Sequence, residues 1–445
     1  MTRVLAAYPA VVSTLLVLTP LVAPRSGPLA LATILSAHLT LAALVLVPIA
    51  IARRAPALRW SLLVLALVAV ARFGDEWFSM PPNVGSSSDV FRTATWNLEL
   101  GARSGDDAVE GIRRLDVDVL ALQELGPEHV RAINESSELM QRFPVRELHP
   151  APGVFGIGLL SRHPVIRTDY YPEPSTIEAV LDVGGQPVTV ITAHPLPGFI
   201  STVGPLPVSF DAGRRDIALR RVRNVVEDTI GRGETVVLLG DFNVAPTEPA
   251  YAELVDGLRD AHVEVGVGPG WTWRPSRLES AGIGLLRIDL AISGSGARPV
   301  SVRELCDLPG DHCLLQAAYQ LATPSVEPIF LLLPGGADSR PLPVSVVDES
   351  GVLAGARPAL RHGAPGGAQG VPGQPELVRV TWLGGLCDVH AAIKVEGSVD
   401  HLRLAIESHQ TGNACPAVGV FRTIELRFLE AIDPTVIDVV QAPIS

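Results

Sequence analysis

The chain has 445 residues, which is too long for one ordinary domain and predicts two or three folding units. Charged residues make up only 18% of the chain and apolar residues 47%, a balance that indicates membrane spans in addition to a soluble part. The formal net charge of -12 argues against a general nucleic-acid binder that neutralises many phosphates, although it leaves room for a nuclease that uses a metal at one scissile phosphate.

Three apolar runs occupy the first 80 residues: Val4–Ala23, Leu29–Ile51 and Leu62–Ala71. The first two approach the ~20 residues needed to cross a bilayer. The third is short, but Trp60 and Trp77 bracket it, so we expect a thin span with an aromatic belt. The alternative for the first run is a cleaved signal peptide, because Arg3 precedes it and small residues follow it.

Basic residues between the second and third runs predict the orientation of these spans. Arg53, Arg54 and Arg59 mark that loop as cytoplasmic, and three spans then place the rest of the chain outside. We therefore expect a multi-pass membrane protein whose main domain is extracytoplasmic; a different number of spans would reverse its side. We expect His38, inside the second run, to hydrogen-bond to a neighbouring helix instead of forming a ligand site.

Composition divides the chain after this membrane anchor of residues 1–80. Residues 81–89 form a Pro, Gly and Ser-rich linker, residues 90–322 a central domain, and residues 323–375 a Pro and Gly-rich linker. Alternating apolar residues in 376–445 predict a small antiparallel β domain, for which a Cys387–Cys415 disulfide would be a suitable staple. We find no catalytic pattern there, so this domain is expected to pack against or bind a protein partner of unknown kind.

In the central domain, polar residues of catalytic type follow successive apolar strands. In chain order they are Asn97, Glu124, His194, Asp241 with Asn243, Asp289, and Asp311 with His312. Each is common in turns or caps when it occurs alone. Together they offer carboxylate oxygen for a hard cation, an acid beside a histidine that would act as general base, and an acid and an amide to orient water and phosphate.

This ordered set resembles the endonuclease/exonuclease/phosphatase superfamily, over Val90 to Leu321, about half of the chain. The resemblance implies an α/β fold: a four-layer sandwich of two packed mixed β-sheets flanked by helices, with the active site at one rim. Here transmembrane helices would precede this fold and a small all-β domain would follow it.

The resemblance also implies a metal site and a general base. Glu124 would be the main Mg²⁺ ligand with Asn97 beside it, and Mn²⁺ is the alternative metal. Asp311 would orient His312, which activates the attacking water. Asp289 would act near the phosphate or near the histidine.

For the phosphate, the resemblance implies that Asp241 and Asn243 position it together with the nucleophile. His194 would stabilise the phosphate or the leaving group, as in the branch of deoxyribonucleases, sphingomyelinases and phosphatases. The chain departs from many members in having Leu314 two residues after the histidine where they have a proline, which affects loop shape more than chemistry.

Other segments of the domain carry weaker signals. We interpret Arg214–Ile230 as a helix whose many arginines form a solvated basic face, not a phosphate clamp. The stretch from Pro195 to Gly213 has few charges and suits a lid or a membrane-facing lip. Cys306 and Cys313 flank the loop of the proposed general base, and we hypothesise that a disulfide between them makes this loop rigid outside the cell.

The resulting hypothesis is a Mg²⁺-dependent phosphoesterase, a phosphodiesterase or phosphatase that hydrolyses a phosphoester by metal-assisted in-line attack of water. A lipid headgroup suits the anchor as substrate, whereas DNA suits soluble relatives. The alternative from another class is an extracytoplasmic, non-enzymatic binding or scaffold protein with an inactive phosphoesterase-like domain.

Overall fold

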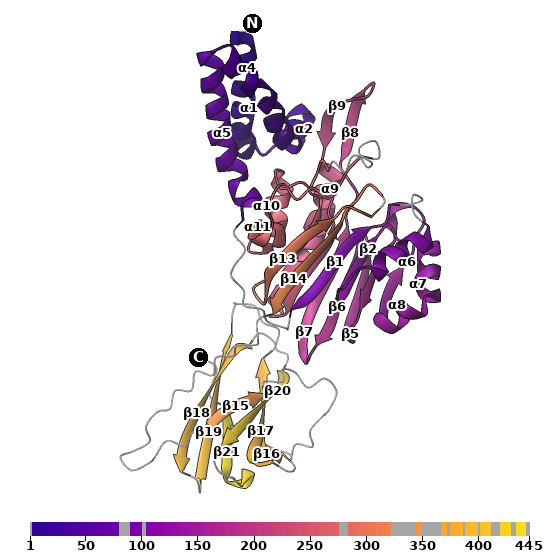
Figure 1. Ribbon diagram of the computed structural model, residues 1–445. Coiled ribbons are helices and arrows are strands. Elements are labelled where there is room, and N and C mark those ends of the chain that lie inside the picture. Colours follow the sequence, from indigo (N-terminus) through magenta and orange to yellow (C-terminus); the bar gives the residue numbers. More distant parts are fainter. Residues whose placement is uncertain are drawn as a thin grey trace. The chain divides into compact units, whose positions relative to one another are not determined.

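The computed structural model describes residues 2–79, 90–99, 104–275, 284–308, 310–321, 344–348, 366–371, 374–385, 388–398, 401–410, 419–428 and 433–441. The chain forms two compact units (Figure 1). One comprises Met1–Ile230 with Glu234–Ala322, and the other comprises Thr323–Ser445 with Gly231–Gly233. The predicted linker at residues 81–89 lies outside the described part of the chain.

Helices form the amino-terminal part of the first unit: α1 (Thr2–Val22), α2 (Gly27–Ile34), α3 (Ser36–Ala42), the 3₁₀ turn η1 (Ala43–Val45), α4 (Leu46–Ala52) and α5 (Pro56–Trp77). Helices α1 and α5 are long and apolar enough to cross a membrane. The second apolar run is bent by 65° between α2 and the segment Ser36–Ala52, so it counts as a third span only if the bent pair is one span. Three spans therefore require the broken segment to cross as a unit.

Helix α1 packs against α5 and α3 through apolar side chains that include Val12, Leu16 and Leu65. His38 of α3 stacks on Trp271, with ring centroids 4.7 Å apart, and its ring nitrogens have no hydrogen-bond partner in the part of the chain that the structure describes. The predicted hydrogen bond from His38 to a neighbouring helix is therefore wrong, because an aromatic ring of the next domain occupies that place.

The central domain contains two mixed six-stranded sheets. The first has the order β13 (Ala297–Leu305), β14 (Leu314–Leu321), β1 (Phe91–Asn97), β2 (Val119–Gln123), β4 (Ile157–Ser161) and β3 (Val145–His149). The second has the order β11 (Arg259–Asp260), β12 (Asp289–Ser293), β10 (Thr235–Asp241), β7 (Gln186–His194), β6 (Ser175–Val183) and β5 (Val165–Pro172). Val119 and Ala121 of the first sheet meet Val188, Val237 and Leu239 of the second in a dry core between them.

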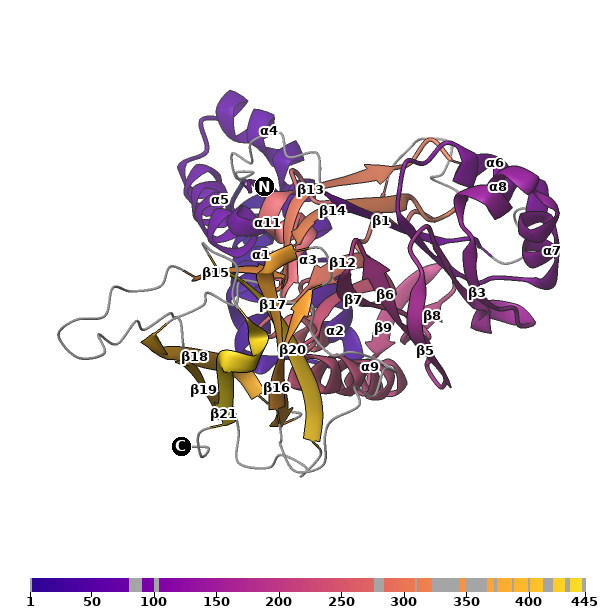
Figure 2. The same cartoon turned by 90° about the horizontal axis from the view of Figure 1, so that it is seen from below.

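Helices cover the outer faces of both sheets. The first sheet packs on α6 (Gly105–Arg113), α7 (Pro127–Glu135) and α8 (Ser137–Arg142), and the second on α9 (Gly213–Gly231) and α10 (Pro249–Val255). A second view of the molecule shows α6–α8 and α9 on different sides of the strands (Figure 2). The short helix α11 (Ala261–Val265) follows β11, and the 3₁₀ turn η2 (Gly153–Phe155) precedes β4. The predicted four-layer α/β sandwich is confirmed.

The strand register sets where the site forms. Strand β1 runs parallel to β2 with Asn97 opposite Gln123, and β7 runs parallel to β10 with Ala193 opposite Gly240. Since parallel strands end at the same edge of a sheet, the polar residues that follow these strands gather at one rim.

The second unit is all β. Its sheets have the orders β15 (Val344–Asp348), β20 (Gly419–Phe428), β17 (Gln374–Gly385), β16 (Gly366–Val371) and β18 (Asp388–Ser398), β19 (His401–Gln410), β21 (Ile437–Gln441), with the 3₁₀ turn η3 (Pro434–Val436) before β21. Strands β15 and β16 lie in the segment that the sequence predicts to be linker; both are edge strands, and the Gly-rich β16 lacks apolar alternation. The pair β19–β21 is parallel, unlike the predicted antiparallel arrangement. Cys387 and Cys415 lie outside the described residues.

Candidate active site

Asp241, the last residue of β10, is the centre of the polar cluster at this rim. Its Oδ2 accepts a hydrogen bond of 3.0 Å from Asn97 Nδ2, and it lies 3.6 Å from Nε2 of both His194 and His312. All four side chains are buried. The structure therefore brings residues from β1, β7, β10 and the segment before β14 to one carboxylate oxygen.

His312 forms its direct hydrogen bond with Asp289, not with Asp311. Its Nδ1 donates to Asp289 Oδ2 at 2.8 Å. Asp289 is held in turn by Thr272, whose Oγ1 accepts hydrogen bonds from the backbone N–H groups of Ile288 and Asp289. This geometry corrects the predicted pairing of Asp311 with His312, since Asp311 receives the indole N–H of Trp273 at 3.3 Å instead.

Glu124 and Asn97 form the other side of the cluster. Asn97 Nδ2 also donates to Glu124 Oε1 at 3.1 Å, and Asn97 Oδ1 accepts from the backbone N–H of Glu99. Glu124 is only half-buried, so one carboxylate of the cluster faces the opening of the site. The same amide group of Asn97 thus bonds both Asp241 and Glu124, the residue that the resemblance implies as a metal ligand.

Backbone strain concentrates here. Among the described non-glycine residues, five have positive φ, and three of these are Glu99 (50°), Glu124 (55°) and Asn243 (53°). Such conformations are unfavourable for L-residues and persist where the surroundings fix them, frequently at functional sites. Asn243 is fixed on both sides, because its N–H donates to Asp241 Oδ1 and its Nδ2 donates to the Pro195 carbonyl.

Gly240 is required by close packing of β10 on β7. A Cβ at this position would lie 2.1 Å from the carbonyl oxygen of Ala193, and the φ of Gly240 is 155°. The glycine before Asp241 therefore serves the close approach of two parallel strands.

The ionisable groups perturb one another strongly. Burial acts to lower the pKa of His312, but Asp289 and Asp241 outweigh it and raise that pKa to about 10. Burial likewise opposes protonation of His194, but Asp241 and Glu124 raise its pKa overall. Burial raises the pKa of Asp289, whereas for Asp241 the two imidazoles overcome burial and lower the pKa.

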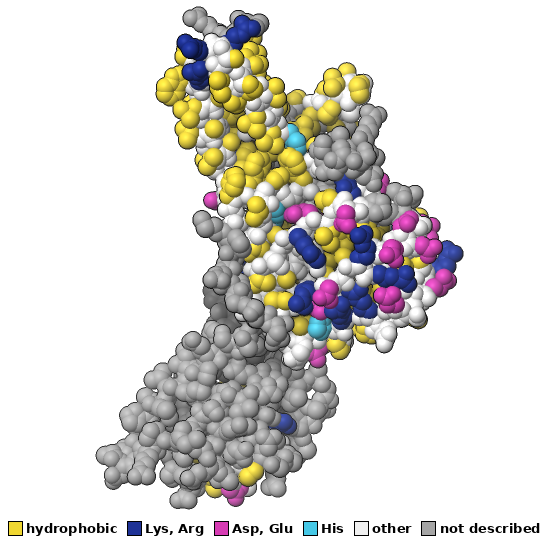
Figure 3. All heavy atoms as spheres, viewed as in Figure 1, with side chains coloured by type: hydrophobic (Ala, Val, Ile, Leu, Met, Phe, Trp, Pro, Cys, Tyr) yellow, Lys and Arg dark blue, Asp and Glu magenta, His cyan; other side chains and the backbone are white. Residues whose placement is uncertain are grey.

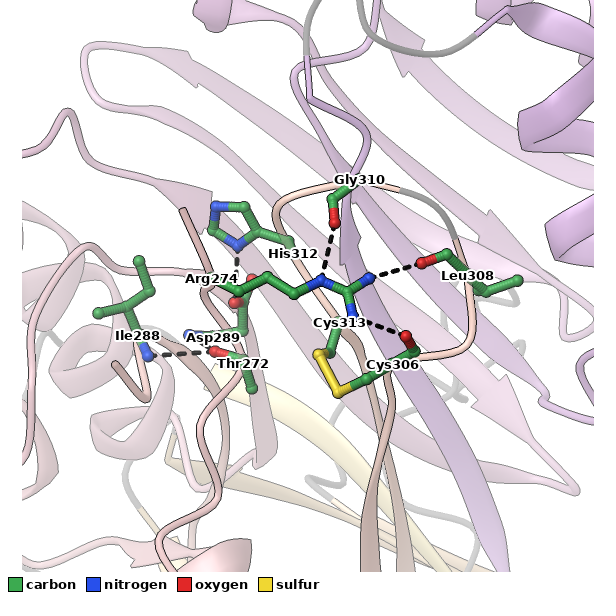
Figure 4. The surroundings of a disulfide bond; sticks show 9 residues. All are labelled: Thr272, Arg274, Ile288, Asp289, Cys306, Leu308, Gly310, His312 and Cys313. Carbon is green, nitrogen blue, oxygen red and sulfur yellow. Dashed lines mark hydrogen bonds and ion pairs between the residues drawn. A yellow bond between two sulfur atoms is a disulfide. The ribbon is translucent and has the colours of Figure 1, made fainter. Parts of the chain in front are cut away.

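The loop that carries His312 is fixed by a disulfide and an arginine (Figure 4). Cys306 and Cys313 form a disulfide across a sequence separation of 7, which confirms that predicted bridge. The guanidinium of Arg274 donates to the carbonyl oxygens of Cys306, Leu308 and Gly310 at 2.7, 2.7 and 2.9 Å. The loop that carries His312 is thus held by one covalent bond and three hydrogen bonds.

Several contacts in this polar cluster were not predicted from the sequence. Glu99 accepts the Asp311 N–H, Thr272 supports Asp289, and the Val154 carbonyl lies 3.0 Å from His194 Nδ1. Glu99 follows Asn97 by two residues, a spacing that could have indicated it. Backbone carbonyls such as that of Val154 leave no sequence signal.

One arginine of the basic helix α9 departs from the predicted solvated face, whereas Arg214, Arg220 and Arg221 are exposed as predicted. Arg215 is 2% exposed and is not part of a solvated face. Its guanidinium donates to the Asn243 carbonyl at 2.9 Å and forms ion pairs with Asp216 and Glu248 at 2.8 and 2.7 Å. This arginine therefore helps to fix the backbone of Asn243, two residues after Asp241.

Two groups of residues could hold a cation. One is Asp241, Asp289 and His312, whose ligand atoms lie within 4.8 Å of one another. The other is Glu124 with Asn97. Mg²⁺ prefers oxygen ligands and retains several waters, a preference that the half-buried carboxylate of Glu124 suits better than a histidine already bonded to Asp289.

A cation also fits the charge balance of the rim. Buried oxygens Oδ1 of Asp289 and Asp311 have no hydrogen-bond partner among the described residues. Burial further raises the pKa of Asp311 to about 6. Crowded, incompletely bonded carboxylates are stabilised by positive charge.

The central domain is similar to proteins of a known family and to solved structures. The model of the Endonuclease/Exonuclease/phosphatase family matches residues 94–312. Similar solved structures include the 3'-5' exonuclease NExo from Neisseria meningitidis, at 20% identity and a TM-score of 0.41 over 52% of this chain and 99% of that chain. An AP endonuclease from Archaeoglobus fulgidus matches at 18% identity and a TM-score of 0.41 over 52% of this chain and 100% of that chain. No curated protein matches the chain.

Proposed function

We propose, from the premise that residues 94–312 belong to the endonuclease/exonuclease/phosphatase family, that this domain is a divalent-metal-dependent phosphoric ester hydrolase. The observation that carries the proposal is the convergence of Asn97, His194 and His312 on the buried carboxylate of Asp241, with Asp289 behind His312. A scaffold protein has no need for two buried imidazoles around one carboxylate, because each buried ionisable group opposes folding.

His312 is the general base of this mechanism. Asp289 binds its Nδ1 and fixes the tautomer in which Nε2 faces the site, so that Nε2 can take a proton from water. The water oxygen then attacks phosphorus in line with the departing ester oxygen. Proton transfer leaves an imidazolium, which the Asp289 carboxylate stabilises.

His194 acts as a fixed positive group beside the phosphate. Its Nδ1 is engaged with the Val154 carbonyl, so Nε2 is the nitrogen that faces Asp241 and the substrate. Its raised pKa favours the imidazolium form, which would stabilise negative charge on the phosphoryl oxygens or the leaving group. Asp241 and Asn243 hold the geometry between the two histidines.

Glu124 and Asn97 would hold the cation, Mg²⁺ or Mn²⁺, and its chemistry would be to offset the charge that develops on the phosphoryl oxygens. The positive charge near Glu124 would also oppose the carboxylates that raise the pKa of His312, and so favour the neutral imidazole that a base requires.

Kinetics of the full-length protein in detergent test this proposal with bis(4-nitrophenyl) phosphate and 4-nitrophenyl phosphate as substrates. Glu124→Ala and His312→Ala should each lower kcat/KM by about 100-fold or more, the usual effect of losing a metal ligand or a general base. The matched control is His149→Ala, since His149 forms a similar pair with Glu147 at 2.7 Å outside the site. Wild-type activity in both site variants would refute the assignment.

Metal binding can be measured without activity. Mg²⁺ at about 100 times its Kd should stabilise the wild-type protein by about 2.7 kcal/mol, and this increment should vanish in Glu124→Ala. An equal increment in both proteins would place the cation elsewhere.

The anchor and its orientation are part of the proposal. We infer that α1, the bent segment α2–α4 and α5 hold the protein in a membrane, with the Arg53–Arg54 loop on the cytoplasmic side. The loop before α2 and the end of α5 both contact the catalytic domain, which is the arrangement that three crossings require. The Cys306–Cys313 disulfide supports an oxidising, extracytoplasmic location for this domain.

A further inference from the structure

A two-stranded hairpin projects from the rim of the active site. It consists of β8 (Phe199–Val203) and β9 (Leu206–Asp211), which replace the irregular lid or lip expected from the sequence. The segment from Pro195 to Phe210 contains no charged residue, although 18% of the whole chain is charged. An isolated hairpin without charges is poorly suited to water.

The apolar side chains of this hairpin are exposed. Their exposed fractions are 43% for Leu196, 71% for Phe199, 50% for Ile200, 69% for Val203, 66% for Leu206 and 39% for Val208. Exposed apolar side chains that adjoin one another on a single element mark an interaction surface, whereas scattered ones do not.

The surface of the hairpin is continuous with the membrane anchor. Ser26, before α2, and Gly27, the first residue of α2, form β-bridges with Asp211 and Phe210 of β9. Phe210 also packs in one apolar cluster with residues of α2. A space-filling view shows hydrophobic side chains over the helices and again at the projecting hairpin, while basic side chains gather at the end of the helices that lies away from the central domain (Figure 3).

The base of the hairpin belongs to the active site. Strand β7 ends at His194, and the next residue, Pro195, accepts the Asn243 amide through its carbonyl at 3.0 Å. At the other end of the hairpin, the guanidinium of Arg215 lies 5.2 Å from the ring centre of Phe210 and donates to the Asn243 carbonyl. The element that carries the apolar surface therefore connects directly with residues that position the phosphate.

We infer that β8–β9 inserts its apolar tip into the same bilayer that holds α1 and α5, and that the substrate is a phospholipid whose phosphoester lies at that bilayer's surface. This inference rests on the proposed phosphoester hydrolysis. In the reaction, water oxygen forms a bond to phosphorus while a P–O ester bond breaks, and the departing alcohol leaves with one proton of that water. Nucleic acid fits this surface poorly, because an uncharged hairpin offers no cation to its backbone.

The first test locates the hairpin. Val203→Cys, labelled with an environment-sensitive fluorophore in full-length protein that also carries Cys387→Ser and Cys415→Ser, is reconstituted into phosphatidylcholine vesicles; Arg131→Cys on exposed α7 is the control. We expect nitroxide lipids to quench the probe at 203 and aqueous iodide to quench it about fivefold less than the probe at 131. Quenching by iodide alone would overturn membrane insertion, and protection from both quenchers would assign the surface to a second copy of the chain and overturn it as well.

The second test identifies the substrate. Full-length protein is incubated with vesicles of phosphatidylcholine that contain phosphatidylglycerol or phosphatidic acid, and in parallel with soluble bis(4-nitrophenyl) phosphate. The triple variant Phe199→Ser, Val203→Ser, Leu206→Ser should lower the ratio of lipid to soluble turnover about tenfold, because lipid capture depends on the buried apolar surface. The control Ile166→Ser, an equally apolar residue of β5 that is 56% exposed, should leave this ratio unchanged.

The outcomes separate the two proposals. Hydrolysis of the soluble diester or of DNA with all vesicle lipids intact would overturn the lipid substrate and leave the hydrolase proposal standing. Absence of hydrolysis with every phosphoester would refute the hydrolase proposal and the lipid substrate together, while the quenching result would still decide whether the hairpin meets the bilayer.

Discussion

Asp289→Asn should separate catalysis from stability in this protein. The wild-type carboxylate binds His312 Nδ1 through Oδ2, whereas its buried Oδ1 has no hydrogen-bond partner among the described residues. The asparagine amide has the same shape, and its oxygen can still accept the N–H of His312. The substitution therefore removes the charge and leaves the orientation of the imidazole nearly unchanged.

The expected catalytic loss follows from that charge. Two opposite charges about 4 Å apart attract by about 4 kcal/mol at an effective dielectric constant of about 20. The Asp289–His312 attraction is realised when His312 has taken the proton, so most of it is lost from the transition state. At about 1.4 kcal/mol per tenfold change, kcat should fall by about three orders of magnitude.

The stability of the variant should not fall with its activity. Burial raises the pKa of Asp289, so the charged form opposes folding once the pH exceeds the ordinary range for Asp. Neutral asparagine removes that opposition, but it also removes the charge that raises the pKa of His312 and so stabilises its buried imidazolium. The two effects on the free energy of unfolding oppose each other, and we expect the melting temperature to change little near neutral pH. An aspartate whose pKa is lowered by folding behaves in the opposite way. It stabilises the folded protein when the pH is above the ordinary pKa of Asp, and this stabilisation is lost as the pH falls through the lowered pKa.

Asp260→Asn is the matched contrast. Asp260 is also buried, but it accepts hydrogen bonds from Arg287, Tyr251 and the His262 N–H at 2.7, 2.7 and 2.8 Å, and Arg287 lowers its pKa against the effect of burial. Breaking this buried pair should destabilise the protein by about 3 kcal/mol. Both variants are compared by thermal unfolding in detergent and by kcat on bis(4-nitrophenyl) phosphate. An active Asp289→Asn enzyme, or one destabilised as much as Asp260→Asn, would refute the reasoning.

Three further predictions concern the loop, the rim and the pH dependence. Cys306→Ser with Cys313→Ser should lower the free energy of unfolding by about 2 kcal/mol, which corresponds to the entropy of closing so small a ring. Urea denaturation measures this change, and wild-type protein reduced with dithiothreitol serves as the reference that lacks the same disulfide. Gly240→Ala should destabilise by about 3 kcal/mol or prevent folding, because its Cβ would overlap the Ala193 carbonyl; near-normal thermal unfolding would contradict the packing of β10 on β7. Asp311→Asn should raise the melting temperature in metal-free buffer more at about pH 7 than at about pH 4, because burial raises the pKa of Asp311 to about 6; an equal rise at both values would contradict this.

The family resemblance implied the sandwich, and the strand ends indicated which polar residues lie near one another. Apolar runs show where a buried strand lies, and in a parallel pair such as β7 and β10 the residues after the strands must meet. This reasoning located His194 and Asp241 together without any knowledge of the register. Reasoning from strand ends did not predict which of these side chains contact one another.

The partner of His312 could not be predicted in the same way. Asp311 precedes it in the sequence, but adjacent residues of extended chain point in opposite directions. Asp289 lies 23 residues upstream and reaches His312 only through the packing of β12 beside β10. Likewise, apolar composition alone gave no sign of the 65° bend after α2, because each half of that segment is equally apolar.

The amino-terminal helices and the candidate site are joined through a series of charged side chains. Arg25, before α2, bonds Asp216 at 2.7 Å, and Asp216 bonds Arg215, which holds the Asn243 carbonyl. Arg25 also pairs with Glu253. A continuous series of ion pairs and hydrogen bonds therefore connects the loop of the anchor to the backbone of a residue at the catalytic rim.

A second connection reaches the opposite side of the site. Glu76, near the end of α5, accepts two hydrogen bonds from the buried guanidinium of Arg287 at 3.2 and 3.1 Å, and Asp289 follows Arg287 by two residues. Removal of the helices would leave this guanidinium only Asp260 and Tyr251, and loss of a partner from a buried charge is strongly unfavourable. The amino-terminal helices thus pack in one unit with the candidate site. With these helices in a bilayer, as proposed, the contacts would hold the site at one height above it. The proposed lipid substrate would reach that height through the place of its headgroup in the membrane.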